Sequence, residues 1–323
     1  MKAFIVRVVR YVLLFCVIAA PAFAQHYPSK PIRLVVGFAA GGPSDVGART
    51  IGQKLTEKWG QQVIVDIRPG AGGNIATEIV AKAPPDGYTL LLPAFAHAVN
   101  PSLYSRLPFD AEKDFAPIVL FASTPNMLVT HPSLPVTSVK ELIAYAKTRP
   151  GQLSFGSAGN GTASHFAGEL LNMMGGIKLV HIPYKGIAPA HTDTIGGQVQ
   201  MMFDSVVNGL PAVKAGRLRA LAVTTLKRWQ GAPEVPTMSE AGLKGYEVNS
   251  WYGLLAPAHT PRDIIDRLNA EVRRSLHEPD ARERLFSIGA EPMDNTPEEF
   301  GAYIRAEMEK WAKVVKAAGI RAD

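Results

Sequence analysis

The chain has 323 residues, a formal net charge of +6 and a single cysteine, and 47% of its residues are hydrophobic. A chain of this length usually forms two domains, and one cysteine excludes an intramolecular disulfide that would support them. No basic run of five or more residues occurs, so nucleic acid is not an expected partner.

The N-terminus has the three regions of a secretory signal peptide. A basic stretch precedes the apolar segment 11–20, and an A-x-A cleavage site ends at Ala24. The apolar segment is short for a membrane span, and Phe15 precedes Cys16 where a lipoprotein needs a small residue. We therefore expect cleavage after Ala24 and an exported, soluble chain without a lipid anchor. Removal of the three basic residues of this leader lowers the net charge to +3.

The segment 34–55 predicts a buried strand, a glycine loop and the start of a helix. The loop 37–42 contains three glycines, Ser44 and Asp45 are candidate N-caps, and Gly60 follows Trp59 as a stop signal. Glycines let a ligand approach the backbone, and the first helical turn has free N–H groups at the positive end of the helix dipole. This pattern favours an anion site, although such turns also occur in α/β proteins that bind nothing there.

Strand and helix signals alternate through the following residues. Strands are expected at 63–66, 88–92, 115–121 and 126–130, and helices at 74–83 and 138–148. This alternation predicts a mostly parallel sheet with helices on both faces. Ligands of such sheets bind beyond the carboxyl ends of the strands, where 37–42, 70–73 and 93–97 fall.

A second copy of the glycine unit follows more than a hundred residues after the first. Here 153–155 is the expected strand, 156–161 the glycine loop and 162–174 the helix, which Gly175 and Gly176 end. Two such units can face each other across a cleft. Further strands are expected at 178–182, 199–203, 218–224 and 251–256, and helices at 188–195, 261–277 and 296–318.

Sequence spacing argues against several catalytic sites. The glycines fit neither a dinucleotide fingerprint nor a nucleotide phosphate loop, and Phe155 stands where a nucleophile elbow at Ser157 needs glycine. The histidines show no metal-ligand spacing. We expect no catalytic residue, no metal and no cofactor.

Two polar residues near the expected cleft have two interpretations each. Asp204, at the end of strand 199–203, is either an acceptor for a ligand or water, or the cap of the next helix. His165, in the helix of the second glycine unit, favours a packing or loop-bracing role over a ligand contact.

Several of these segments, taken together and in order, resemble one known family. They are 31–45, RPGAGGN at 68–74, APPDGYTLL at 83–91, 156–165, HIPYK at 181–185, GGQVQMMFD at 196–204 and VPTMSEAG at 235–242. The chain from about Tyr27 onward resembles the Bug-type extracytoplasmic receptors of tripartite tricarboxylate transporters. The resemblance implies a periplasmic, monomeric receptor with a two-domain type II periplasmic binding-protein fold. It also implies a small carboxylate ligand and, as partners, the membrane components of such a transporter.

The resemblance also implies a ligand site with two walls, in which backbone amides and ordered water hold the carboxylate. The first wall is Phe38, Ala39, Ala40, Gly41, Ser44 and Asp45, with Gly72 and Gly73. The second wall is Ser157, Ala158, Gly159, Asn160, Thr162 and His165, with Asp204. Family members vary at 95–97 and at His191, so the ligand is left open among di- and tricarboxylates, acidic amino acids and aromatic acids.

Domain one is expected at 25–120 plus 253–323 and domain two at 121–252, with strands 115–121 and 251–256 as the hinge. The leading interpretation is a receptor that delivers a carboxylate to a transporter. Two alternatives stay open: an exported hydrolase or lyase that uses Asp204, His165 or Ser157, and a sensor subunit of a signalling system.

Overall fold

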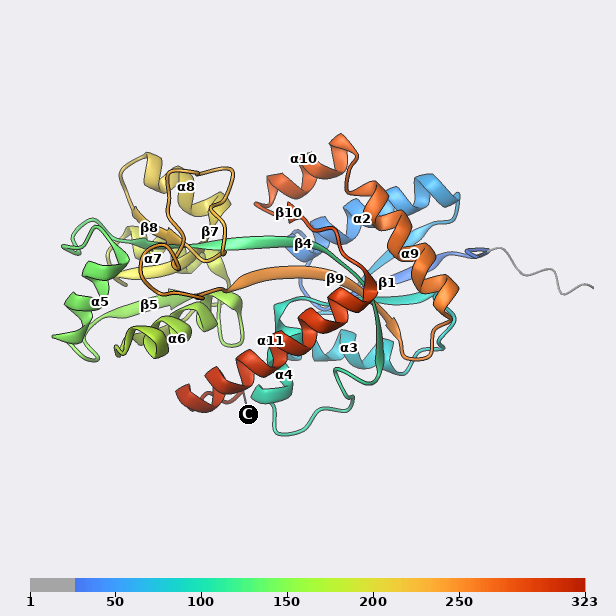
Figure 1. Cartoon of the computed structure of the whole chain (residues 1–323), viewed down its shortest axis with the longest axis horizontal. Coiled ribbons are helices and arrows are strands. Elements are labelled where there is room, and N and C mark those ends of the chain that lie inside the picture. The colour runs from blue at the N-terminus through green and yellow to red at the C-terminus, as the bar shows by residue number, and fades with distance from the viewer. Residues whose placement is uncertain (1–26, 323) are drawn as a thin grey trace, which may run out of the picture.

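The computed structural model describes residues 27–322 and has an α/β fold (Figure 1). The expected signal peptide lies outside the described residues. One sheet of ten strands runs in the order β2-β1-β3-β9-β4-β7-β5-β6, and β8 and β10 also pair with β4. The strands are β1 (Ile32–Val36), β2 (Val63–Ile67), β3 (Thr89–Leu92), β4 (Phe115–Thr130), β5 (Ser154–Ser157), β6 (Val180–Pro183), β7 (Met201–Ser205), β8 (Arg219–Val223), β9 (Asn249–Pro257) and β10 (Glu291–Pro292).

Helices cover both faces of the sheet, as the alternation of signals predicted. On the half of the sheet that contains β1, helices α2, α9 and α10 lie on one side and α3, α4 and α11 on the other (Figure 1). The helices are α2 (Pro43–Trp59), α3 (Asn74–Ala81), α4 (Phe95–Leu103), α5 (Val139–Lys147), α6 (Ala163–Gly175), α7 (Ile187–Ile195), α8 (Val206–Lys214), α9 (Arg262–Ser275), α10 (Pro279–Ser287) and α11 (Pro297–Ala318). A short 3-10 turn, η1 (Ala71–Gly73), precedes α3.

The two halves of the sheet repeat one design. In the first half, β1 lies between β2 and β3 and is parallel to both. In the second half, β5 lies between β6 and β7 and is again parallel to both. Each central strand leads into one of the glycine loops, so each loop lies at the carboxyl end of a parallel set.

Two long strands connect the halves, and one of them differs from expectation. Residues 115–121 and 126–130 were expected to be separate strands, but both belong to the single strand β4. The strand pairs with β9 as far as Pro125 and with β7 and β8 from Asn126 onward. Proline has no N–H to donate, so its position in β4 fits the point where one set of partners ends and the next begins.

Helix α2 begins before the N-cap positions that were expected, Ser44 and Asp45. Its N-cap is Gly42, and Pro43 occupies the first helical position, so Ser44 and Asp45 lie inside the first turn. Proline tolerates this position because its missing N–H has no helical acceptor there. The stop at Gly60 is confirmed, because this residue is left-handed and caps the helix through its N–H.

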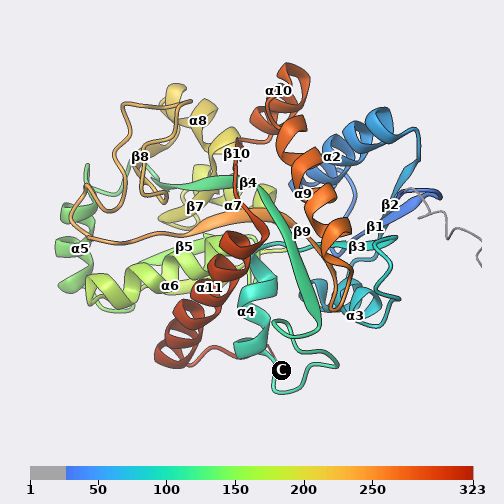
Figure 2. The ribbon, with the colours of Figure 1, turned by 45° about the vertical axis from the view of Figure 1, so that its right-hand side comes forward.

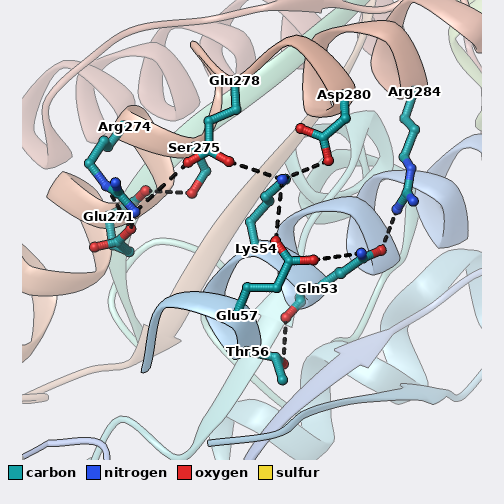
Figure 3. Close-up of polar contacts among 11 residues, drawn as sticks. Gln53, Lys54, Thr56, Glu57, Glu271, Arg274, Ser275, Glu278, Asp280 and Arg284 are labelled. Atoms are coloured by element: carbon teal, nitrogen blue, oxygen red, sulfur yellow. Dashed lines mark hydrogen bonds and ion pairs between the residues drawn. The ribbon is translucent and has the colours of Figure 1, made fainter. Parts of the chain in front are cut away.

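A cluster of charged side chains joins helix α10 to helix α2. Lys54 has only 8% of its side chain exposed, and its Nζ lies 2.6 Å from Asp280, 2.9 Å from Glu278 and 3.3 Å from Glu57 (Figure 3). Hydrogen bonds, first to Asp280 and then to Glu278, raise the pKa of Lys54. Because α2 also carries the first glycine loop at its other end, the cluster fixes that helix against the C-terminal part of the chain.

Helix α11 extends beside α4 and reaches α6, so it touches elements of both halves (Figure 2). Its start is well defined, because Thr296 and Glu299 form a complete capping box. Trp311, which is fully buried, packs between Phe95 of α4 and Phe166 of α6. The C-terminal helix therefore connects the two halves independently of the long strands.

Candidate functional site

The first glycine loop contacts the loop after β2 backbone to backbone. A Cβ on Gly37 would lie 2.8 Å from the Cα of Gly73, so glycine is required for this approach. Gly73 is itself left-handed, with φ +93°, and packs beside the ring of Phe38. The structure therefore brings Phe38, Gly72 and Gly73 together, as the first wall of the expected site requires.

Most backbone N–H groups of the first loop have no protein acceptor. Gly41 N–H donates to Asp45 Oδ2 at 2.8 Å, and Gly42 N–H donates weakly to Ala39 O at 3.4 Å. Within residues 27–322, no hydrogen bond occupies the N–H groups of Phe38, Ala39, Ala40, Ser44 or Asp45. Ala39 and Ala40 are exposed. A helix start with free amides is a binding site for an anion.

Asp45 is not the N-cap of α2, and its side chain contacts the loop from inside the first helical turn. Its carboxylate is buried, receives the N–H of Gly41 and lies 2.8 Å from Arg49 Nε. The carboxylate therefore accepts a hydrogen bond from one backbone N–H of the loop and stabilises the loop conformation. Any ligand anion meets the remaining amides of the loop, because Gly41 N–H already has an acceptor.

Asn100 supports the first wall and was not foreseen from the sequence. Its Nδ2 donates to Gly72 O at 3.0 Å and to Asn74 Oδ1 at 2.7 Å. Gly72 has φ +63°, a conformation that glycine adopts without strain. The side chain of Asn100 thus holds the turn that presents Gly72 and Gly73.

In the second glycine loop, most amides are occupied within the loop itself. Ala158 N–H donates to Ser164 Oγ at 3.0 Å, Gly159 N–H to Ser157 Oγ at 3.1 Å, and Gly161 N–H to His165 Nδ1 at 3.3 Å. Thr162 caps α6, as its side chain accepts from the N–H of His165. In the described chain, the N–H groups of Asn160, Ala163 and Ser164 have no hydrogen-bond acceptor.

His165 has the bracing role that the sequence favoured. Only 3% of the residue is exposed, and its Nδ1 accepts from the loop. Burial, and secondly the neighbouring His181, lower the pKa of His165 to about 3. The ring is therefore neutral at ordinary pH.

Asp204 lies beneath the surface of the candidate site. It is fully buried, its Oδ2 lies 2.5 Å from His191 Nδ1, and its Oδ1 accepts from Ser205 N–H. Burial raises the pKa of Asp204 to about 6. Ser205, not Asp204, is the N-cap of α8, so the capping interpretation is wrong.

The arrangement does not complete a hydrolase triad. Ser157 Oγ lies 2.6 Å from His181 Nε2, which is the distance of a nucleophile from its base. However, Ser157 is fully buried, and no carboxylate of residues 27–322 contacts His181 to orient it. The same residues also contain no group of three side chains able to hold a metal ion.

The two walls lie at different halves of the sheet. No hydrogen bond or ion pair of the described residues joins 38–45 to 157–165. The second loop does approach the first half elsewhere, since a Cβ on Gly161 would lie 3.4 Å from Leu103 of α4. Neither loop contains lysine or arginine, so each offers only directed N–H groups and helix dipoles to an anion.

The chain is similar to one family model and to several solved structures. The family model described as tripartite tricarboxylate transporter family receptor matches residues 47–320. The structure of R. palustris Rpa4515 with adipate is 40% identical, with a TM-score of 0.79 over 91% of this chain and 99% of that one. The periplasmic binding protein BugD is 39% identical, with a TM-score of 0.75 over 91% and 99%. MatC (Rpa3494) from Rhodopseudomonas palustris with bound malate is 34% identical, with a TM-score of 0.75 over 90% and 100%.

None of the helices in residues 27–322 is long and apolar enough to cross a membrane.

Proposed function

Because the chain belongs to the family of tripartite tricarboxylate transporter receptors, we propose that it captures a small carboxylic acid between its two halves and delivers it to a transporter. The family consists of periplasmic solute receptors rather than enzymes. Rpa4515 with adipate and MatC with malate make dicarboxylates the first class to consider. In this proposal the signal peptide is removed after Ala24, and the mature protein acts as a monomer.

The observation that carries the proposal is the set of free amides on a loop without basic residues. Within residues 27–322 the N–H groups of Phe38, Ala39 and Ala40 have no acceptor, and the same holds for Ser44 and Asp45 in the first turn of α2. A carboxylate is a small planar anion that accepts two or more such hydrogen bonds. The internal carboxylate of Asp45 already shows how this backbone binds one, through Gly41 N–H.

Capture between the halves requires a hinge, and β4 and β9 fit this role. We place domain one at 25–120 plus 253–323 and domain two at 121–252. The exchange of partners along β4, after Pro125, supports a boundary near this point. Closure would then bring the amides of the second loop, including that of Asn160, toward a ligand on the first.

A thermal-shift screen tests this function. A ligand that binds only the folded protein stabilises it by about 2.7 kcal/mol at a hundredfold excess over its Kd. We expect a shift with at least one of adipate, malate, citrate, glutamate or benzoate, and a smaller radius of gyration in solution scattering with the same compound. If only sugars or cations shift the transition, a carboxylate receptor is excluded.

A further inference from the structure

His181 lies in a stack of rings beneath the second glycine loop. Its ring is parallel to that of His165, with centroids 3.9 Å apart and an interplanar angle of 13°. It also stacks on Phe155, with centroids 5.0 Å apart and an angle of 26°. Two stacked neighbours restrict rotation of the imidazole, so its edge nitrogens have defined directions.

The edge of this ring meets the loop through Ser157. His181 Nε2 lies 2.6 Å from Ser157 Oγ, and the same Oγ accepts the N–H of Gly159 at 3.1 Å. The hydroxyl also lies 3.3 Å from Gly159 O as a donor. Ser157 thus contacts both polar groups of Gly159, and His181 fixes the hydroxyl that does so.

The second ring of the stack holds the loop two residues further along. His165 Nδ1 accepts the N–H of Gly161, so this nitrogen carries no proton and the imidazole is neutral. Gly159 and Gly161 have φ +124° and +79°, and a loop with two such residues needs external contacts to stay in one conformation. His165 contacts Gly161 directly, and His181 acts on Gly159 through the hydroxyl of Ser157.

We infer that His181 is a positioning residue, which together with His165 locks the second glycine loop in the shape that receives the ligand. Ser157, which His181 contacts, accepts the N–H of Gly159, and His165 accepts the N–H of Gly161. Within residues 27–322 the amide of Asn160, between them, has no acceptor, and Asn160 is exposed. That a ligand binds at this loop rests on the proposed function. The contacts by which His165 and His181 hold the loop do not depend on it.

The stack contains no charge at neutral pH. Burial lowers the pKa of His181 to about 4, and it lowers the pKa of His165 further, to about 3. Among the described residues, Glu169 is the carboxylate that faces the pair, at 3.9 Å from His165 Nε2, and burial raises its pKa. A proton on His165 Nδ1 would remove the acceptor of Gly161 N–H and so one of the contacts that hold the loop.

Amide hydrogen exchange, followed by NMR on the ligand-free protein, tests the lock. His181→Phe keeps a flat ring in the stack and removes the hydrogen bond to Ser157. We expect exchange at Gly159 to accelerate about 5- to 10-fold, the factor that one hydrogen bond is worth. His165→Phe should accelerate exchange at Gly161 instead. His181→Gln, which restores a hydrogen-bonding group, should return part of the protection at Gly159.

His131 provides a matched control, because its Nδ1 lies 2.7 Å from Ser133 Oγ in an exposed segment away from the loop. His131→Phe should leave exchange at Gly159 and Gly161 unchanged. Ser157→Ala removes the acceptor of Gly159 directly and serves if His181→Phe does not fold. Unchanged exchange at Gly159 in both the His181→Phe and Ser157→Ala variants would overturn the inference.

Titration with adipate separates this inference from the proposed function. If the wild type binds adipate, His181→Phe should weaken binding while His131→Phe does not; equal affinity of both variants would also overturn the ligand-related part. If the wild type binds no carboxylate, the receptor proposal fails, and the exchange data alone still decide whether His181 locks the loop.

Discussion

The rings of Phe95 and Phe166 lie 5.8 Å apart, centroid to centroid, although one follows β3 and the other belongs to the helix after β5. Trp311 completes the cluster at 5.0 Å from Phe95 and 5.3 Å from Phe166. Helix α4, whose Asn100 supports the first wall, and helix α6, which begins at the second wall, therefore share one buried aromatic contact. A closing motion has to pivot near this cluster, because separating the rings would expose them.

Replacement of Trp311 by Ala should therefore destabilise the whole chain. Loss of a fully buried indole costs about 3–5 kcal/mol. Phe286→Ala is the matched control: Phe286 stacks on Trp229 across the same two halves but is 49% exposed. Its loss should cost about 1 kcal/mol or less. Urea unfolding measures both, and equal losses would show that the buried cluster has no special role.

The two glycine loops should respond to substitution for different reasons. Gly41→Val meets no atom within 4 Å but forces a β-branched residue to φ +80°. Gly159→Val is strained at φ +124° and also places its Cβ 3.0 Å from Tyr184 O. Such strain costs about 1–3 kcal/mol, and binding that requires the native loop conformation should weaken by about 5- to 150-fold.

Two controls accompany these glycine variants. Gly216→Val, with φ +69° and open space around it, applies the same strain as Gly41→Val in the turn after α8 and should not affect binding. Lys185→Ala removes an exposed charge near the second loop and should weaken binding little. Calorimetric titration compares the ligand affinities of all four variants. A large loss of affinity in Lys185→Ala alone would mean that a side-chain salt bridge, not the backbone amides, holds the carboxylate.

The Lys54 cluster should be sensitive to salt when its cation is removed. Lys54→Met leaves Glu57, Glu278 and Asp280 facing one another, and their repulsion is screened by ions. We expect a lower melting temperature in low salt that recovers in high salt. Lys82→Met, which breaks the exposed ion pair with Glu78, should change the melting temperature little in low or in high salt. Identical salt responses of the two variants would mean that the cluster does not hold α10 on α2.

Acid should destabilise the protein through its buried histidines. The folded-state pKa of His165 is lowered to about 3, so between pH 6.5 and 3 the unfolded chain binds a proton that the native chain does not. The free energy of unfolding therefore falls as the pH falls, by at most about 1.4 kcal/mol per pH unit for this group. His165→Asn should flatten this dependence, whereas His277→Asn, in an exposed position, should not.

Asp204 has the opposite effect on the pH dependence of the free energy of unfolding. Its pKa is raised to about 6, so as the pH falls the native chain binds this proton before the unfolded chain does. Its contribution is common to wild type and His165→Asn, so the difference between their pH profiles isolates the histidine. Parallel profiles of unfolding free energy from pH 7 to 4 would contradict the assignment of a neutral, buried His165.

The sequence predicted the glycine loops because their signals are local. Strand, glycines and helix start fall within 34–60 and again within 153–176, and the structure confirms both units. The residues that support these loops were missed for the opposite reason. Asn100 contacts Gly72 across 28 residues of chain, and His181 contacts Ser157 across 24. Asn100 lies in no motif, and the HIPYK segment that begins at His181 carries no signal for this contact. The packing of α4 against η1 brings Asn100 to its loop, and the parallel pairing of β5 with β6 brings His181 to the other.

Three helices were also missed, and two of them contain proline. Pro101 lies within α4 and Pro211 within α8, where proline normally indicates the end of a helix. Both helices are about two turns long and are held by burial of one face, which outweighs their poor propensity. The third, α10, begins at Pro279 and has four charged residues among nine, so its apolar spacing is weak.

The central claim, capture of a carboxylate by backbone amides, is tested most directly by calorimetric titration of the mature protein with paired ligands. Adipate, malate and citrate are compared with their neutral amides, which have the same shape but no charge. We predict that at least one carboxylate binds and that its amide does not. Binding of an amide as tightly as its parent acid, or of no carboxylate at all, would contradict the account.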